Sequence, residues 1–177
     1  MKYFSRELTE RYGSTDDAVA RAADAEWEAA LERYQSYLAS IENELPQHIR
    51  DFNNLLLHDA VVWSIARHGN SLTMVLRKDI PPRDVVVLTY TLTADPVIEK
   101  EALPTDHRGD VMDFQYDEFE LVQQNVRPTY QQSIMFGNGW EMTLQFADVR
   151  VTLAEPIYPL AGTVLVPVSE GAVARSA

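Results

Sequence analysis

The fold is decided by residues 130–146, YQQSIMFGNGWEMTLQF. Two runs rich in aromatic and apolar residues flank Gly137-Asn138-Gly139, and an Asn-Gly pair between such runs is the strongest short-range signal for a β-hairpin. In the second run the apolar residues alternate with polar ones and therefore share one face of a strand. They are Trp140, Met142, Leu144 and Phe146. This stretch predicts an antiparallel hairpin that buries one face.

An earlier hairpin has the same pattern, with Gly69-Asn70 as its turn. Apolar residues alternate on both sides of this turn, and a two-residue loop would bring them onto one face. The opposed pairs that this register predicts are His68–Ser71, Ile65–Met74 and Trp63–Leu76. Together, the two hairpins predict a core that contains Trp63, Met74, Met142 and Leu144.

Further strands are predicted between and after the hairpins. Residues 84–93 form an apolar run after the stiff Pro81-Pro82 connector, which favours a central strand. Residues 112–122 alternate less regularly, and the slip at Asp117-Glu118 predicts a β-bulge. A one-residue shift at Ala147-Asp148 predicts a second bulge. Beyond residue 154 several prolines exclude a central strand, so we expect an irregular segment there.

The N-terminal part has a helical pattern. Residues 14–17 supply an N-cap and an acidic first turn, and apolar residues then recur every three or four positions. This predicts a long helix over residues 16–43 and a short one over residues 46–56, where Pro46 suits a first helical position. We expect a single α+β domain over 1–177. Its residues 1–56 are helical and pack on a mostly antiparallel sheet of about six strands in 57–153, and residues 154–177 are irregular.

Composition and charge exclude several kinds of partner and of active site. The chain has 15 Lys and Arg residues against 27 Asp and Glu residues, a net charge of −12, and no cysteine. An acidic protein repels nucleic-acid phosphates and anionic membrane surfaces, so neither partner is expected. The lack of cysteine excludes disulfides, thiolate metal sites and a cysteine nucleophile. A charged N-terminus and short apolar runs favour a cytoplasmic protein.

The acidic charge is concentrated in one segment. Residues 95–120 contain nine acidic and two basic residues, whereas residues 61–92 contain four basic and two acidic ones. The two segments either pair inside the fold, which we favour, or one of them faces a partner. The residues considered for binding a basic protein partner are Asp106, Asp110, Asp113, Asp117 and Glu118. Glu118 and Glu120 share one face of a strand, and we expect that face to be exposed.

The pair His58-Asp59 resembles the His-Asp pair of metal-dependent phosphohydrolases. Those enzymes carry the pair on a helix and use further His and Asp ligands, whereas here it opens a strand and the later chain adds only His68 and His107. A hydrogen bond at the start of the strand is the favoured interpretation. A metal site of His58, Asp59 and His107 is the alternative. The sequence has no nucleophile motif, phosphate loop or dinucleotide fingerprint, so no cofactor is predicted.

Several short segments resemble a bacterial family of uncharacterised proteins. They are MKYFSRE at 1–7, LHDAV at 57–61 with Ser64-Ile65, GNSLTM at 69–74, IMF at 134–136, WEM at 140–142 and FADV at 146–149. Members of that family begin with Met-Lys-Tyr-Phe and carry a His-Asp pair at the start of a strand in the C-terminal half. The resemblance implies a bacterial cytosolic origin. Because the family has no assigned activity, it transfers no catalytic residue.

These patterns support two main hypotheses of function. The first is a non-catalytic acidic protein-interaction module, of the adaptor or toxin-neutralising type. This hypothesis rests on analogy with other small acidic α+β proteins, that is, on fold class and charge alone. The alternative is a metal-dependent hydrolase or small-ligand binder around His58 and Asp59. A structural subunit that dimerises through the long helix is a third option, and the oligomeric state stays open.

Overall fold

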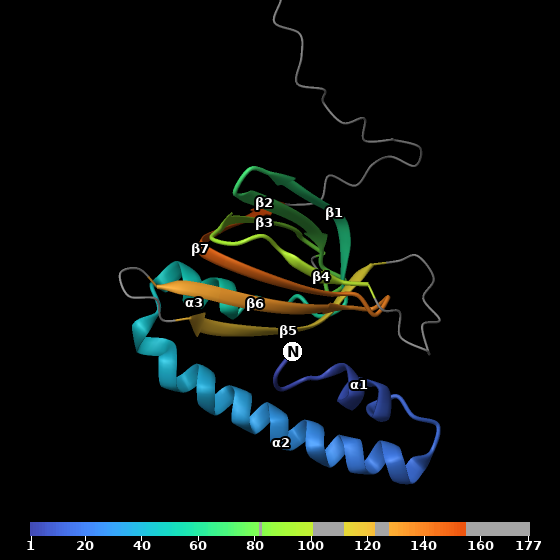
Figure 1. Cartoon of the computed structure of the whole chain (residues 1–177). Coiled ribbons are helices and arrows are strands. Elements are labelled where there is room, and N and C mark those ends of the chain that lie inside the picture. Colours follow the sequence, from blue (N-terminus) through green and yellow to red (C-terminus); the bar gives the residue numbers. More distant parts are fainter. Residues whose placement is uncertain (82, 101–111, 123–127, 155–177) are drawn as a thin grey trace, which may run out of the picture.

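The computed structural model describes residues 1–81, 83–100, 112–122 and 128–154 (Figure 1). The α-helices are α1 (Arg6–Tyr12), α2 (Asp17–Ile41) and α3 (Gln47–Asn53), with a 3₁₀ turn at Glu42–Glu44 after α2. The strands are β1 (Ala60–His68), β2 (Ser71–Arg77), β3 (Val85–Leu92), β4 (Val97–Glu99), β5 (Asp113–Val122), β6 (Thr129–Phe136) and β7 (Glu141–Ala154). The long helix and the short one after it are confirmed, and α1 is an additional helix before them.

The strands close into a six-stranded antiparallel barrel. Their order is β3-β2-β1-β5-β6-β7, pairing of β3 with β7 closes the ring, and β4 pairs with the first part of β7. The antiparallel α+β class is thus confirmed, but the sheet closes into a barrel, which the sequence did not predict. The length of β7 explains the closure, because residues 141–146 pair with β6 and residues 146–154 pair with β3.

A bulge lies where β7 changes partner. Thr91 of β3 pairs with Asp148, the next residue Leu92 pairs with Phe146, and Ala147 is skipped. This position is the one at which the sequence predicted a bulge. A bulge bends a strand and increases its twist, which allows one strand to serve two neighbours in a closed ring. The bulge predicted at Asp117-Glu118 is wrong, because both residues pair with β6 in continuous register, and the irregularity of β5 lies between Phe114 and Tyr116 instead.

The main core fills the barrel. Phe52 of α3 contacts Tyr90, Phe119 and Phe146, with ring centroids 6.0, 6.4 and 6.1 Å away. All three contacts have the edge-to-face geometry that favours aromatic pairs. α3 therefore packs its apolar side into the same core as the strands.

Three of the four predicted core residues are buried. Met74, Met142 and Leu144 are at most 2% exposed, whereas Trp63 is 49% exposed. The pairs His68–Ser71 and Ile65–Met74 form as predicted. The register then shifts between Val62 and Ser64. This bulge takes Trp63 out of the predicted pairing, so its assignment to the core is wrong.

A second, smaller core lies outside the barrel. Its buried members are Phe4, Leu8, Ala23, Ala30 and Tyr34. The N-terminal segment and α1 lie between α2 and the barrel strands (Figure 1). α2 consequently covers the N-terminal segment and the outside of β5.

Two tyrosines of α2 accept hydrogen bonds from the backbone on one edge of β5. In the described part of the chain, β1 pairs with β5 only through Ala60 and Val61, so the rest of that edge of β5 lacks a strand partner. The Tyr34 hydroxyl accepts the Phe119 N–H at 2.6 Å, and the Tyr37 hydroxyl accepts the Leu121 N–H at 2.8 Å. Burial raises the pKa of both hydroxyls, so they stay neutral. α2 therefore completes the barrel wall where the strand ladder stops.

Candidate functional site

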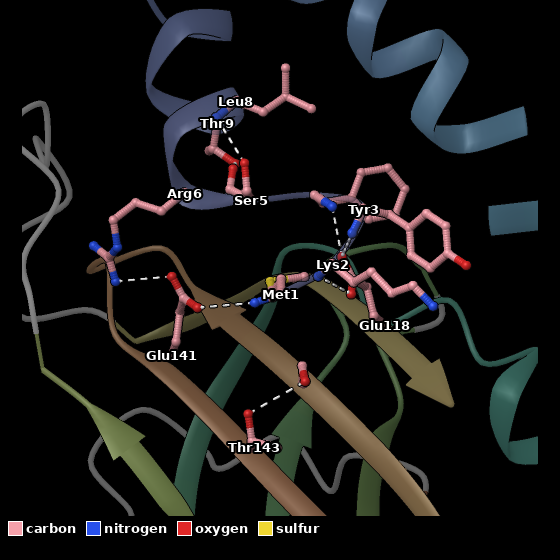
Figure 2. A network of polar contacts seen from close by, with 12 residues as sticks. Met1, Lys2, Tyr3, Ser5, Arg6, Leu8, Thr9, Glu118, Glu141 and Thr143 are labelled. Carbon is pink, nitrogen blue, oxygen red and sulfur yellow. Dashed lines mark hydrogen bonds and ion pairs between the residues drawn. The ribbon is translucent and has the colours of Figure 1, made fainter. Parts of the chain in front are cut away.

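Glu118 of β5 holds the N-terminal segment (Figure 2). Its carboxylate accepts the backbone N–H groups of Lys2 at 2.6 Å, Tyr3 at 2.7 Å and Phe4 at 2.6 Å. Hydrogen bonds to an ionised acceptor are roughly twice as strong as neutral ones. Glu118 is only 2% exposed. The expectation that it faces water is therefore wrong, because the chain's own amide groups occupy it.

Glu141, the first residue of β7, fixes the same segment (Figure 2). Its carboxylate lies 3.6 Å from the Met1 ammonium group and 3.1 Å from the Arg6 guanidinium. Arg6 also donates to the main-chain oxygen of Gly139 at 2.5 Å. We call the contacts of residues 1–6 with Glu118 and Glu141 the N-terminal clamp. The clamp ties the start of the chain to two strands of the barrel.

Asp117 is the last group of a hydrogen-bonded network that links β3, β6 and β5. The Tyr90 hydroxyl donates to Gln132 Oε1 at 2.7 Å, and Gln132 Nε2 donates to Asp117 Oδ2 at 2.8 Å. Burial raises the pKa of Asp117 to about 6; the Gln132 hydrogen bond acts in the opposite direction, and the neighbouring Glu118 charge adds to the rise. The carboxyl of Asp117 thus has an internal partner.

Asp113 is 5% exposed and lies against the turn before β7. Its carboxylate accepts from Gln115 Nε2 at 3.1 Å, and its main-chain oxygen accepts the Gly137 N–H at 2.9 Å. Asp106 and Asp110 lie outside the described residues. The three predicted binding residues that the structure does describe, Asp113, Asp117 and Glu118, therefore all have partners inside the protein.

His58 and Asp59 form the turn that leads into β1. His58 Nδ1 pairs with the main-chain oxygen of Gln115, and His58 Nε2 lies 3.5 Å from Asp59 Oδ2. The Gln115 amide also donates to Asp59 at 3.3 Å and to Asp113 at 3.1 Å, so it bridges the two carboxylates. The hydrogen bond expected at the start of the strand is thus present. Within the described ranges no three His, Asp or Glu side chains are arranged to hold a metal ion, and His107 lies outside those ranges.

Exposed acidic residues follow one another along α2. Asp24, Glu28 and Glu32 are spaced four apart, which places them on one side of the helix. None of the three has an ion-pair partner within the described residues, in contrast to Glu26, which pairs with Arg11 at 2.6 Å. We call these three residues the acidic stripe. They were missed at the sequence level, although their regular spacing was a visible signal.

A groove of about 630 Å³ separates α3 from the second half of β7. One wall consists of His48, Asp51 and Leu55, and the other of Asp148, Val149, Arg150, Val151 and Leu153. His48 Nε2 lies 2.7 Å from Asp148 Oδ1 and bridges the two walls. The groove exists because β7 has left β6 at this point. That is a tertiary feature, and no local sequence pattern marks it.

No protein-family model matches the chain, and no curated protein matches it significantly. The resemblance to a bacterial family therefore stays a prediction. Among the described helices, none is both long and apolar enough to cross a lipid bilayer.

Proposed function

We propose that the protein is a non-catalytic interaction module, of the adaptor or toxin-neutralising type, that binds a basic partner through the acidic stripe of α2. The observation that carries this proposal is the spacing of Asp24, Glu28 and Glu32 on an exposed helix face. Like charges four residues apart destabilise a helix by about 0.2–0.5 kcal/mol per pair. The stripe therefore costs stability, and a cationic surface placed against it would offset that cost.

The charge of the whole chain also favours a basic partner. A net charge of −12 attracts basic partners over long range and raises their association rate at low salt. The acidic side chains of the stripe lie in water, where they can meet a partner without any change in the fold. Their cost of desolvation on binding is lower than that of buried carboxylates.

The contact surface proposed from the sequence is less suitable. Asp113 and Glu118 are buried, and Glu118 is occupied by three backbone amide groups. Freeing Glu118 for a partner would break the hydrogen bonds of the N-terminal clamp. We therefore place the contact surface on α2 instead of on residues 95–120, and the expected partner is still a basic protein.

The hydrolase alternative ranks lower. His58 and Asp59 are neighbours, but the amide of Gln115 occupies both Asp59 and Asp113. A catalytic metal ion needs three protein ligands around one point. The described residues offer no such group at His58.

The proposal can be tested with a fluorescein-labelled nonalysine peptide and the full-length chain. The stripe variant combines Asp24→Asn, Glu28→Gln and Glu32→Gln. The control variant combines Asp79→Asn, Asp84→Asn and Glu99→Gln, which changes the net charge by the same amount elsewhere. Fluorescence anisotropy at low salt and at roughly 150 mM salt gives the dissociation constants.

We expect the stripe variant to bind about tenfold more weakly than the wild type. This corresponds to about 1.4 kcal/mol, or roughly half a kcal/mol for each exposed charge. The control variant should lose about twofold or less. Equal losses in the two variants would mean that the peptide senses only the net charge, and the stripe would then not be the contact.

A further inference from the structure

The second half of β7 has one edge without a strand partner. Residues 146–154 pair with β3 on one side, while pairing with β6 stops at Phe146. Within the described residues no strand pairs with the other edge after that point. The free edge from Asp148 to Ala154 is roughly 20 Å long at 3.4 Å per residue. Exposed edges of this kind are templates for an additional strand.

The groove between α3 and β7 runs along this edge. Successive residues of a strand point to opposite faces, yet both the odd and the even residues from Asp148 to Val151 line the groove. A groove over one face of the strand would be lined by alternate residues only. Lining by both sets places the groove beside the edge, where the backbone amide and carbonyl groups of β7 are accessible.

The two sets of lining residues differ in chemistry. Val149, Val151 and Leu153 form an apolar row, and Leu55 on the opposite wall adds to it. Asp148 and Arg150 form a charged row on the other side of the strand. Leu153 is 59% exposed, so its apolar surface lies in water. Arg150 is exposed and has no ion-pair partner within the described part of the chain.

We propose that this groove binds an extended peptide segment of another protein, which pairs with β7 as an added strand. The chemistry of the two rows defines the peptide: apolar residues alternate with charged ones, and an acidic residue faces Arg150. The apolar side chains cover Leu153 and its row, and main-chain hydrogen bonds to β7 supply the register. This site shares no residue with the acidic stripe, so either proposal can fail without the other.

A fluorescein-labelled peptide of sequence TVEVKVT, blocked at both ends, serves as the probe for the full-length chain. A peptide of sequence TVVVEKT has the same composition but lacks the alternation. Leu153→Glu and Arg150→Glu change the two rows of the groove. Leu56→Glu is the matched control, because Leu56 is 72% exposed and does not line the groove.

We expect TVEVKVT to bind and to slow hydrogen exchange of those amides in residues 149–154 that point away from β3. Leu153→Glu should weaken binding at least tenfold, Arg150→Glu should weaken it about fivefold, and Leu56→Glu should change it less than twofold. Equal binding of the two peptides would overturn the proposal. So would protection, in the protein alone, of those amides of residues 149–154 that point away from β3. Protection independent of concentration would mean that the same chain fills the edge, and protection that grows with concentration would mean that a second copy does.

Discussion

Glu118→Gln tests the N-terminal clamp with a minimal change of shape. Oε1 of Glu118 accepts the N–H groups of Tyr3 and Phe4, and Oε2 accepts that of Lys2. A glutamine oxygen can keep two of these bonds as neutral ones, with a loss of about 1 kcal/mol each. Its NH₂ group faces the third N–H and leaves that donor unsatisfied, which costs about 1–3 kcal/mol. We therefore expect the free energy of unfolding to fall by about 3 kcal/mol or more.

Urea denaturation of the two full-length proteins measures this change directly, and thermal unfolding should show a midpoint lower by roughly 6–12 °C for a chain of this size. Glu120→Gln is the matched control. Glu120 lies two residues further along β5, and it pairs at 3.4 Å with a Lys2 side chain that is 64% exposed, so the loss of this ion pair should cost much less than the loss of the buried Glu118 carboxylate. If Glu118→Gln changes the free energy of unfolding by no more than Glu120→Gln does, the clamp does not stabilise the fold.

Three further changes test other parts of the structure. Asp117→Asn should gain roughly 2–3 kcal/mol relative to the wild type between pH 4 and pH 7, because the folded pKa of about 6 lies above the ordinary 3.8, so ionisation opposes folding as the pH rises through this range. Gly137→Ala should destabilise the fold by about 2 kcal/mol or more, because its Cβ would lie 1.8 Å from Asp113 Oδ1. Tyr34→Phe should cost about 1–3 kcal/mol, because it leaves the buried N–H of Phe119 without its acceptor.

Each of these changes has its own control. Parallel pH profiles of wild type and Asp117→Asn in urea titrations would contradict the raised pKa. Gly13→Ala should be nearly neutral, because its Cβ would lie 3.7 Å or more from the nearest atoms, and an equal loss at Gly137 and Gly13 would contradict the close packing. Tyr37→Phe should cost less than Tyr34→Phe, since the Tyr37 hydroxyl is only part-buried.

Much of the fold could be predicted because it is local. The Gly69-Asn70 and Asn138-Gly139 turns and the alternation around them fix the two hairpins, and the three- and four-residue spacing fixes α2. The bulge at Ala147 was also predictable, since it interrupts the alternation of one strand. Barrel closure was not, because it depends on the pairing of β3 with β7, which are more than fifty residues apart in the chain.

Side-chain roles were harder to predict than strands. A glutamate in a strand normally faces water, so nothing local marks Glu118 as a residue that binds the backbone of residues 2–4. Trp63 was misassigned because one bulge in β1 changes which residues point inward. The groove beside β7 likewise depends on where a strand loses its neighbour, which no single segment of sequence records.

An NMR titration of isotope-labelled full-length protein with the nonalysine peptide locates the contact without any mutation. We expect the largest amide shift changes within residues 21–35 of α2, around Asp24, Glu28 and Glu32, and no change in the barrel interior. Shift changes centred on His58 and Asp59, or spread evenly over all acidic residues, would contradict binding through the acidic stripe.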